Sequence, residues 1–314
     1  VIGVLQLLNA RDPKTGDVIA FSAEVQPVVE ALASQAAVAL ENQQLLFAQR
    51  ELLEAFIKVI ANAIDKKSPY TGGHCQRVPI ITEMLAEAAN TVQSGPYSDF
   101  YLDEEGMYEL RISAWLHDCG KVTTPEYVVD KATKLETIYD RVNTLRARFE
   151  VLKRDAEIAH LRAAMQGGGA ADEEALNAEI AAIDDDFAFI EKANIGGEFM
   201  DDVDIERVKR ISERVWVDSE GVERPILNEN EIYNLTIRKG TLPPEERKII
   251  NDHIVVTLDM LGELPFPKNL RKVTEYAGGH HERMDGGGYP NGLRGDEMSV
   301  PARMMAIADI FEAL

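Results

Sequence analysis

Residues 280–290 read HHERMDGGGYP: two adjacent histidines, an acid and then, after two residues, an aspartate, three glycines, a tyrosine and a proline. Glycine permits tight turns and close backbone approaches, and proline restricts the chain where this run ends. A plain surface loop is the alternative interpretation, but the histidines directly before the glycines argue against it. The run indicates a polar site whose other members must come from elsewhere in the chain.

Histidines elsewhere in the chain extend this site. The chain has six histidines, and we expect five of them at helix ends or on apolar helix faces: His74, His117, His253, His280 and His281. His160 lies on a polar face and is interpreted as a solvated residue. A lone histidine on an apolar face is usually a core residue, but burying several without a metal would leave donors and acceptors unsatisfied. Together with Asp118 and Asp309, these histidines indicate a site for Fe, Mn or Zn.

Composition limits the classes of partner. The 314 residues are enough for roughly two domains. The net charge is -21, from 54 acidic and 33 basic residues. This charge argues against binding to nucleic-acid polymers and against binding to an anionic membrane surface. No apolar run has the length of a membrane span. Cys75 and Cys119 each adjoin a histidine motif rather than forming a paired framework, so we expect a reducing, cytoplasmic setting.

The first part of the chain is expected to be a strand followed by a long helix. VIGVLQLLN, residues 1–9, has the composition of a strand, and RDPKTGD after it predicts a turn. From about residue 28 to 64 the helical pattern contains no glycine or proline, and one side of it carries Leu32, Ala36, Ala39, Leu46, Leu53, Ile57, Ile60 and Ile64. This length favours a connecting helix that pairs with its copy in a homodimer, with one face of a core helix as the alternative.

The middle of the chain predicts an inserted antiparallel helical hairpin at about residues 134–239. Apolar residues recur at steps of three and four from Leu135 to Ala163 and again from Leu176 to Ile190. The glycine-rich QGGGA separates these two stretches, and a third helix and a turn at DSEG follow. Everything after residue 22 is expected to be helical apart from turns. We interpret the hairpin as a projecting arm that has a possible protein partner and no catalytic role.

The remaining segments are predicted to be helices that carry the histidines. They lie near residues 76–90 and 105–119, after GTLPPEER, from about Asn269 and from Pro301. The helix after GTLPPEER is expected to place Ile249, His253, Val256 and Met260 on one face. The fold class is therefore mainly α.

Four of these motifs resemble one known family. HDCGK at 117–121, a later histidine in a helix, HHERMDGGGYP and AIADIFEAL at 306–314 resemble the HD-GYP domain, an all-helical branch of the HD phosphohydrolases. The resemblance covers roughly residues 60–131 and 240–314 and implies a metal-dependent phosphodiesterase for cyclic di-GMP. AAVALENQQL at 36–45 resembles the end of a GAF sensor domain. The expected domains are therefore a GAF-like remnant at 1–45, a linker helix at 46–66 and an HD-GYP domain, incomplete at its C-terminus, at 67–314.

The resemblance also implies a ligand set and a mechanism. Carried over position by position, the metal ligands are His74, His117, Asp118, His253, His280, His281 and Asp309. It implies two divalent ions, Fe or Mn, bridged by Asp118, with His74, His117 and Asp309 on one ion and the three later histidines on the other. Lys121 matches the family's phosphate-contacting lysine. Catalysis would then use Asp118 and Lys121, with a metal-bridging hydroxide attacking phosphorus.

The chain departs from the family pattern at several positions. Tyr70 stands where some members have a glutamate, so we expect two ions rather than three. Pro79 falls within the helix that should carry His74, which makes His74 the least secure ligand. Arg77 and Tyr289 adjoin expected ligands but receive no role, and Cys119 is interpreted as a packing residue.

Other functions remain open at this point. The alternatives are an HD phosphohydrolase that acts on another nucleotide and a non-catalytic signalling module that responds to a cyclic dinucleotide. Measured turnover together with bound metal would distinguish an enzyme from such a module.

Overall fold

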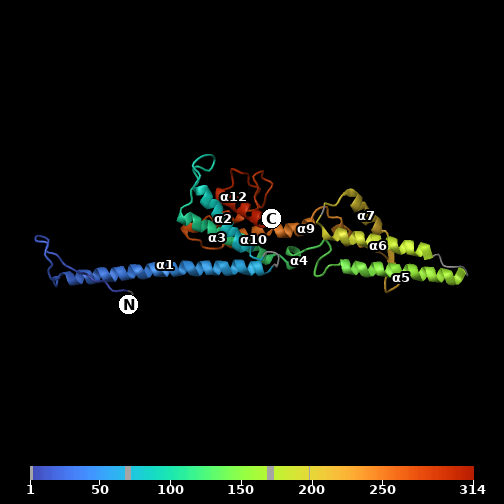
Figure 1. Ribbon diagram of the computed structural model, residues 1–314, viewed down its shortest axis with the longest axis horizontal. Coiled ribbons are helices and arrows are strands. Elements are labelled where there is room, and N and C mark those ends of the chain that lie inside the picture. The colour runs from blue at the N-terminus through green and yellow to red at the C-terminus, as the bar shows by residue number, and fades with distance from the viewer. Residues whose placement is uncertain (1–2, 68–71, 168–172, 198) are drawn as a thin grey trace. The chain divides into compact units, whose positions relative to one another are not determined.

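A computed structural model describes residues 3–67, 72–167, 173–197 and 199–314. The chain divides into two compact units, residues 1–60 and 61–314. It is mainly helical, as expected (Figure 1). The only sheet among the described residues has two strands. The domain boundaries expected from the sequence remain predictions.

The first unit contains a turn and most of a long helix. The helix α1 spans Val25–Lys67 without interruption, which confirms the expected helix. The turn in RDPKTGD also forms, because Asp12 Oδ1 accepts hydrogen bonds from the backbone N–H groups of Lys14 at 2.7 Å and Thr15 at 3.1 Å. The expected strand is wrong for residues 3–9, where the only nearby pairing is an isolated bridge between Arg11 and Val18. A strand is held by hydrogen bonds to a neighbour, and the described residues supply none to this segment.

The helices of the second unit that surround the histidines come from both sides of the insertion. Before it lie α2 (His74–Asn90), α3 (Glu104–Leu116), the 3₁₀ turn η2 (Cys119–Thr123) and α4 (Glu126–Val129). After it lie α9 (Pro244–Asn251), α10 (His253–Gly262), the 3₁₀ turn η3 (Lys268–Leu270), α11 (Val273–Gly278) and α12 (Val300–Glu312).

Packing interleaves these two sets of helices. The helix α2 packs against α3 and α12, α10 packs against η2 and α11, and α11 also packs against α3. One buried cluster joins Ala86, Leu110, Ala114, Tyr276, Met304 and Met305. One helix had been expected to carry both Ile249 and His253, but the chain forms two, which meet at Asp252. This break places His253 at the start of α10.

The inserted segment contains more than a hairpin. Its elements are α5 (Val142–Gly167), α6 (Glu173–Ile195), α7 (Asp202–Ser212), β1 (Val215–Val217), β2 (Glu223–Pro225) and α8 (Glu229–Leu235). The expected packing of α5 along α6 is present (Figure 1). Residues 168–170 of QGGGA lie outside the described residues. Two expectations are wrong: Leu135 and Ile138 precede α5, and residues 215–225 form a β-hairpin.

The β-hairpin and the late start of α5 both have local causes. Asp218 Oδ1 accepts the N–H groups of Glu220 and Val222, each at 2.9 Å, which forms the DSEG turn and brings β1 beside β2. Asp140 Oδ1 accepts the N–H of Val142, the first residue of α5, at 2.9 Å, so the helix begins only after this side chain. Helical spacing of apolar residues continues before Asp140, but Ile138 is 95% exposed.

The inserted segment has its own hydrophobic core. Its buried cluster comprises Leu135, Leu145, Phe149, Ile183, Ile190, Met200, Val208, Ile211, Ile226, Leu227 and Leu235, all within the insertion. The two ends of the segment lie together, because Lys134 Nζ donates to the carbonyl oxygens of Leu235 at 3.0 Å and Ile237 at 2.7 Å. The insertion is therefore a self-contained arm, hereafter the arm.

We predict that replacing residues 135–237 with a short Gly/Ser linker leaves the rest of the second unit folded, because the arm's core is separate. Circular dichroism and thermal unfolding should show a helical protein with one cooperative transition. In the full chain, Phe149→Ala should destabilise the arm by about 3–5 kcal/mol, as for other buried aromatic truncations. An unfolded deletion variant would show that the arm belongs to the main core.

Candidate metal centre

Three histidines follow the ends of helices, and the same type of hydrogen bond orients each ring. His117 follows α3, His253 follows α9 and His280 follows α11. The last carbonyl groups of a helix lack partners within it. Each ring uses one of them: Nδ1 donates to the carbonyl three residues earlier, at 2.7 Å for His117, 2.5 Å for His253 and 2.6 Å for His280. With the proton on Nδ1, each ring presents an Nε2 lone pair.

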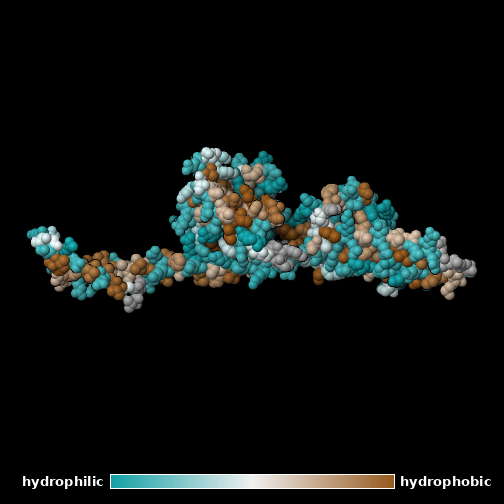
Figure 2. Space-filling model, viewed as in Figure 1, coloured by the Kyte–Doolittle hydropathy of each residue, from teal (hydrophilic) through white to brown (hydrophobic). Residues whose placement is uncertain are grey.

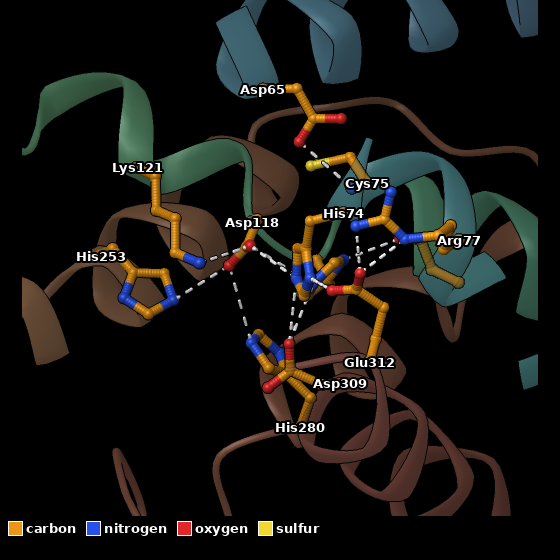
Figure 3. A network of polar contacts seen from close by, with 12 residues as sticks. Asp65, His74, Cys75, Arg77, Asp118, Lys121, His253, His280, Asp309 and Glu312 are labelled. Atoms are coloured by element: carbon orange, nitrogen blue, oxygen red, sulfur yellow. Dashed lines mark hydrogen bonds and ion pairs between the residues drawn. The ribbon is translucent and has the colours of Figure 1, made fainter. Parts of the chain in front are cut away.

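His74 is positioned differently, at the first residue of α2. Pro79 lies within α2, which nevertheless begins at His74, and the role of His74 as a ligand remains a prediction. Its Nδ1 contacts the carboxylate of Glu312 from α12, and Arg77 Nε donates to Glu312 Oε1 at 2.6 Å (Figure 3). Glu312 is a site residue that was not predicted from the sequence. The available signal was its position one helical turn after Asp309.

Asp118 lies at the centre of these rings and is 2% exposed. Its Oδ2 lies 3.5 Å from His74 Nε2 and 3.4 Å from His117 Nε2. Its Oδ1 lies 3.3 Å from His253 Nε2 and 3.8 Å from His280 Nε2 (Figure 3). The two carboxylate oxygens therefore face two different groups of imidazoles.

The remaining expected ligands complete the two groups. Asp309 Oδ1 lies 3.1 Å from His74 Nε2 and 3.7 Å from His117 Nε2. His281 shares a group with His253 and His280 in which donor atoms lie within 4.8 Å of one another. All seven expected positions are thus brought together, while their role as ligands remains a prediction.

Unsatisfied polar atoms test whether this site fits a metal. Asp118 Oδ1 and the Nε2 atoms of His74, His117, His253 and His280 are buried and have no hydrogen-bond partner among the described residues. Burying so many polar atoms without partners is costly. Imidazole nitrogens with carboxylate oxygens suit divalent Fe, Mn or Zn. The residues therefore fit divalent metal ions.

The charges at the site favour bound cations. Burial opposes the ionisation of Asp118, but the Lys121 ammonium, with Nζ at 2.5 Å from Oδ2, and the neighbouring imidazoles hold the pKa of this carboxyl well below its usual range. Burial and the nearby His253 lower the pKa of His281 to about 4, so this ring is neutral. Despite burial, contacts with Asp118, Asp309 and Glu312 raise the pKa of His74 to about 10. Three carboxylates thus converge on His74.

The loop after His281 is held by Glu282 rather than by the site's polar groups. Glu282 is 4% exposed, and its carboxylate accepts the N–H groups of Asn291 at 2.7 Å and Leu293 at 2.8 Å. A Cβ on Gly288 would lie 2.5 Å from the Glu282 Cα, so glycine is required there. Tyr289 stacks on the His281 ring, with centroids 4.8 Å apart. The loop therefore supports the orientation of His281.

The turn after Asp118 lies tightly against α10. Thr257 Oγ1 accepts the Gly120 N–H at 2.9 Å and donates to the His117 carbonyl at 3.2 Å. A Cβ on Gly120 would lie 2.0 Å from the carbonyl oxygen of His253. Cys119 is 2% exposed, and burial raises the pKa of its thiol to about 11, which agrees with a packing role.

The last turn of α1 contacts the same region. Lys67 Nζ donates to the carbonyl oxygens of Lys121 at 3.2 Å, Val122 at 2.6 Å and Thr124 at 2.6 Å. Asp65 Oδ1 accepts the N–H of Cys75, the residue after His74, at 3.2 Å. Two side chains of α1 thus hold the backbone beside His74 and around Lys121.

Parts of this chain are similar to known proteins. The HD domain family matches residues 229–314. A Vibrio cholerae protein named probable cyclic di-GMP phosphodiesterase is 36% identical over 91 residues, 26% of this chain and 20% of that protein. A 3'3'-cGAMP-specific phosphodiesterase 1 of the same organism is 60% identical over 42 residues, 13% of this chain and 10% of that protein. A cyclic di-GMP phosphodiesterase of Thermotoga maritima is 36% identical over 80 residues, 26% of this chain and 22% of that protein.

These relatives are matched over only part of their length. The chain spans about a fifth or less of each curated relative described above. In the part of the chain that the structure describes, no helix is both long and apolar enough to cross a membrane.

We predict that Gly120→Ala disrupts the centre, because its Cβ would lie 2.0 Å from the His253 carbonyl oxygen. The change should push η2 away from α10 and lower both the melting temperature and the metal content of the purified protein. Gly262→Ala is the matched control, since a Cβ there meets nothing within 4 Å. Equal metal content in the two variants would contradict the claim that this close approach sets the site.

Proposed function

We propose that this chain is a metal-dependent phosphodiesterase that hydrolyses a cyclic dinucleotide, with cyclic di-GMP as the principal substrate. The observation that carries the proposal is the buried Asp118 carboxylate, whose two oxygens face two groups of unpaired imidazole nitrogens. The HD domain match and the phosphodiesterase names of the relatives support the same reaction class.

The proposed ligands form two sets that share Asp118. His74, His117 and Asp309 would hold one ion, and His253, His280 and His281 would hold the other. The two donor groups support two ions, Fe or Mn, since both accept mixed nitrogen and oxygen ligands. Tyr70, which first suggested two ions rather than three, lies outside the described residues.

Different groups would have different roles in the proposed reaction. Divalent ions, when bound, activate water for attack on phosphorus and neutralise phosphate charge. Lys121 extends from η2, with its side chain 25% exposed beside Asp118, and can donate to a phosphoryl oxygen as negative charge grows there. The buried, poorly ionised Cys119 is not needed as a nucleophile.

A second substrate has specific support. Three relatives are named 3'3'-cGAMP-specific phosphodiesterases, and one of these is 60% identical over its 42 matched residues. Turnover of cyclic di-GMP and of 3'3'-cGAMP should therefore be measured side by side on metal-loaded protein. Higher kcat/KM on 3'3'-cGAMP would reassign the substrate, and bound metal without turnover of either would favour a non-catalytic signalling module.

The other parts of the chain complete the proposal. Residues 1–45 would be the end of a GAF-like sensor domain, and the arm would bind a protein partner. We also propose a cytoplasmic location, which a cyclic-dinucleotide substrate would require and with which the two free cysteines are compatible.

A homodimer through α1 also belongs to the proposal. Leu32, Ala39, Leu46, Leu53 and Ile60 recur every seven residues, the repeat of a coiled coil. Leu32 is 57% exposed and Leu46 is 67% exposed, and apolar residues recur along α1 (Figure 2). A second copy of α1 would cover this stripe.

We predict that His280→Ala and Asp118→Ala each abolish hydrolysis and lower the bound metal, because each removes a proposed ligand. Elemental analysis of protein purified without added metal, with a cyclic di-GMP turnover assay, checks both effects. Unchanged metal content in both variants would refute the ligand assignment.

Lys121→Ala should separate binding from catalysis. It should keep the metal and slow turnover by about two orders of magnitude, as for the loss of one charge-stabilising donor. Loss of the metal in this variant would mean that Lys121 supports the site rather than the reaction.

The dimer has its own test. The double variant Leu46→Glu and Leu53→Glu should sediment as a monomer, because it places charges in the apolar stripe. Gln44→Glu, two residues from Leu46 and off the stripe, is the control and should remain dimeric. A monomeric unmodified chain would contradict the proposed pairing.

A further inference from the structure

One of the four histidines around Asp118 is oriented by a different kind of partner. Three of them use a carbonyl from the helix that ends just before them. His74 begins its helix, and the carbonyl groups of an α-helix point toward its C-terminus, away from the first residue. His74 therefore needs an acceptor from another element, and Glu312 of α12 occupies that position.

Glu312 is built into the packing between α2 and α12. These two helices are packed closely, and the Glu312 side chain is only 7% exposed. One carboxylate oxygen contacts His74 Nδ1 and the other accepts from Arg77 Nε at 2.6 Å (Figure 3). Arg77 lies three residues after His74 on α2, so the chain His74–Glu312–Arg77 starts and ends on one helix. The arrangement fixes the carboxylate from both sides.

We propose that Glu312 is a positioning residue that directs His74 toward the first ion, and that Arg77 holds Glu312 in place. This inference rests on the proposed function and concerns only the ion site of His74, His117 and Asp309. A carboxylate that accepts from Nδ1 fixes the tautomer, aims Nε2 at Asp118 and Asp309, and increases the basicity of the ring. Such outer partners are typically worth about 10–100-fold in metal affinity.

The two groups of donors therefore differ in charge. Around His74 lie the carboxylates of Asp118, Asp309 and Glu312, whereas the described partners of His253 and His280 are neutral carbonyls and the shared Asp118. A nearby anion favours a cation. Loss of Glu312 should therefore weaken one ion site and leave the other unchanged.

The experiment measures Mn²⁺ affinity of the full chain by competition with a chelator, which resolves tight from weak sites without an activity assay. Glu312→Ala should lower the affinity of one of two ions by about 10–100-fold and leave the second unchanged. Glu312→Gln should recover part of the loss, because its amide oxygen still accepts from Nδ1 but carries no charge. Arg77→Met should give a smaller loss than Glu312→Ala. Glu87→Ala, an exposed position on α2, is the control and should match the unmodified chain.

The outcomes separate this inference from the proposed function. If the unmodified chain binds no Mn²⁺, the proposed function itself fails. If it binds two ions and Glu312→Ala binds both with unchanged affinity, only the positioning role is overturned. Equal weakening of both ions, with no recovery in Glu312→Gln and a lowered melting temperature, would mean that Glu312 serves packing alone.

Discussion

An ionised carboxylate buried among imidazoles is the constraint on which this domain depends. Asp118 is 2% exposed, and a buried carboxylate is strongly unfavourable unless positive charge compensates it. Lys121 supplies one charge, and the four Nε2 atoms around Asp118 can supply more only by binding protons or metal. The surrounding helices are arranged to bring this compensation to both oxygens.

The arrangement uses helix ends more than helix faces. His117, His253 and His280 each satisfy a terminal carbonyl, so the same hydrogen bond that ends a helix also orients a ring. Ring orientation then follows from backbone geometry, which is more rigid than a long side chain. Two segments on either side of the arm can build one site for this reason, since each contributes rings fixed by its own helices.

The sequence predicted the helical class and predicted that five histidines share one site; the structure brings these five together, while their role as ligands remains a prediction. It missed contacts between elements distant in the chain. No sequence pattern connects Glu312 or Lys67 with a partner, because their partners come from the packing of α12 on α2 and from the contact of α1 with the backbone at η2. Glu282 adjoined the histidines but turned toward the following loop. The β-hairpin at 215–225 was not predicted, because strands of three residues are too short to show an alternation of apolar and polar residues.

The lysine at the end of α1 links two processes thermodynamically. Lys67 is hydrogen-bonded to carbonyls of the turn that carries Lys121, while Asp65 holds the N–H beside His74. A displacement of this last helical turn would therefore alter the free energy with which the proposed ligands bind an ion. Reciprocity requires that ion binding alter the free energy of that displacement by an equal amount. Binding of the proposed ions and the position of this last turn of α1 would therefore each depend on the other.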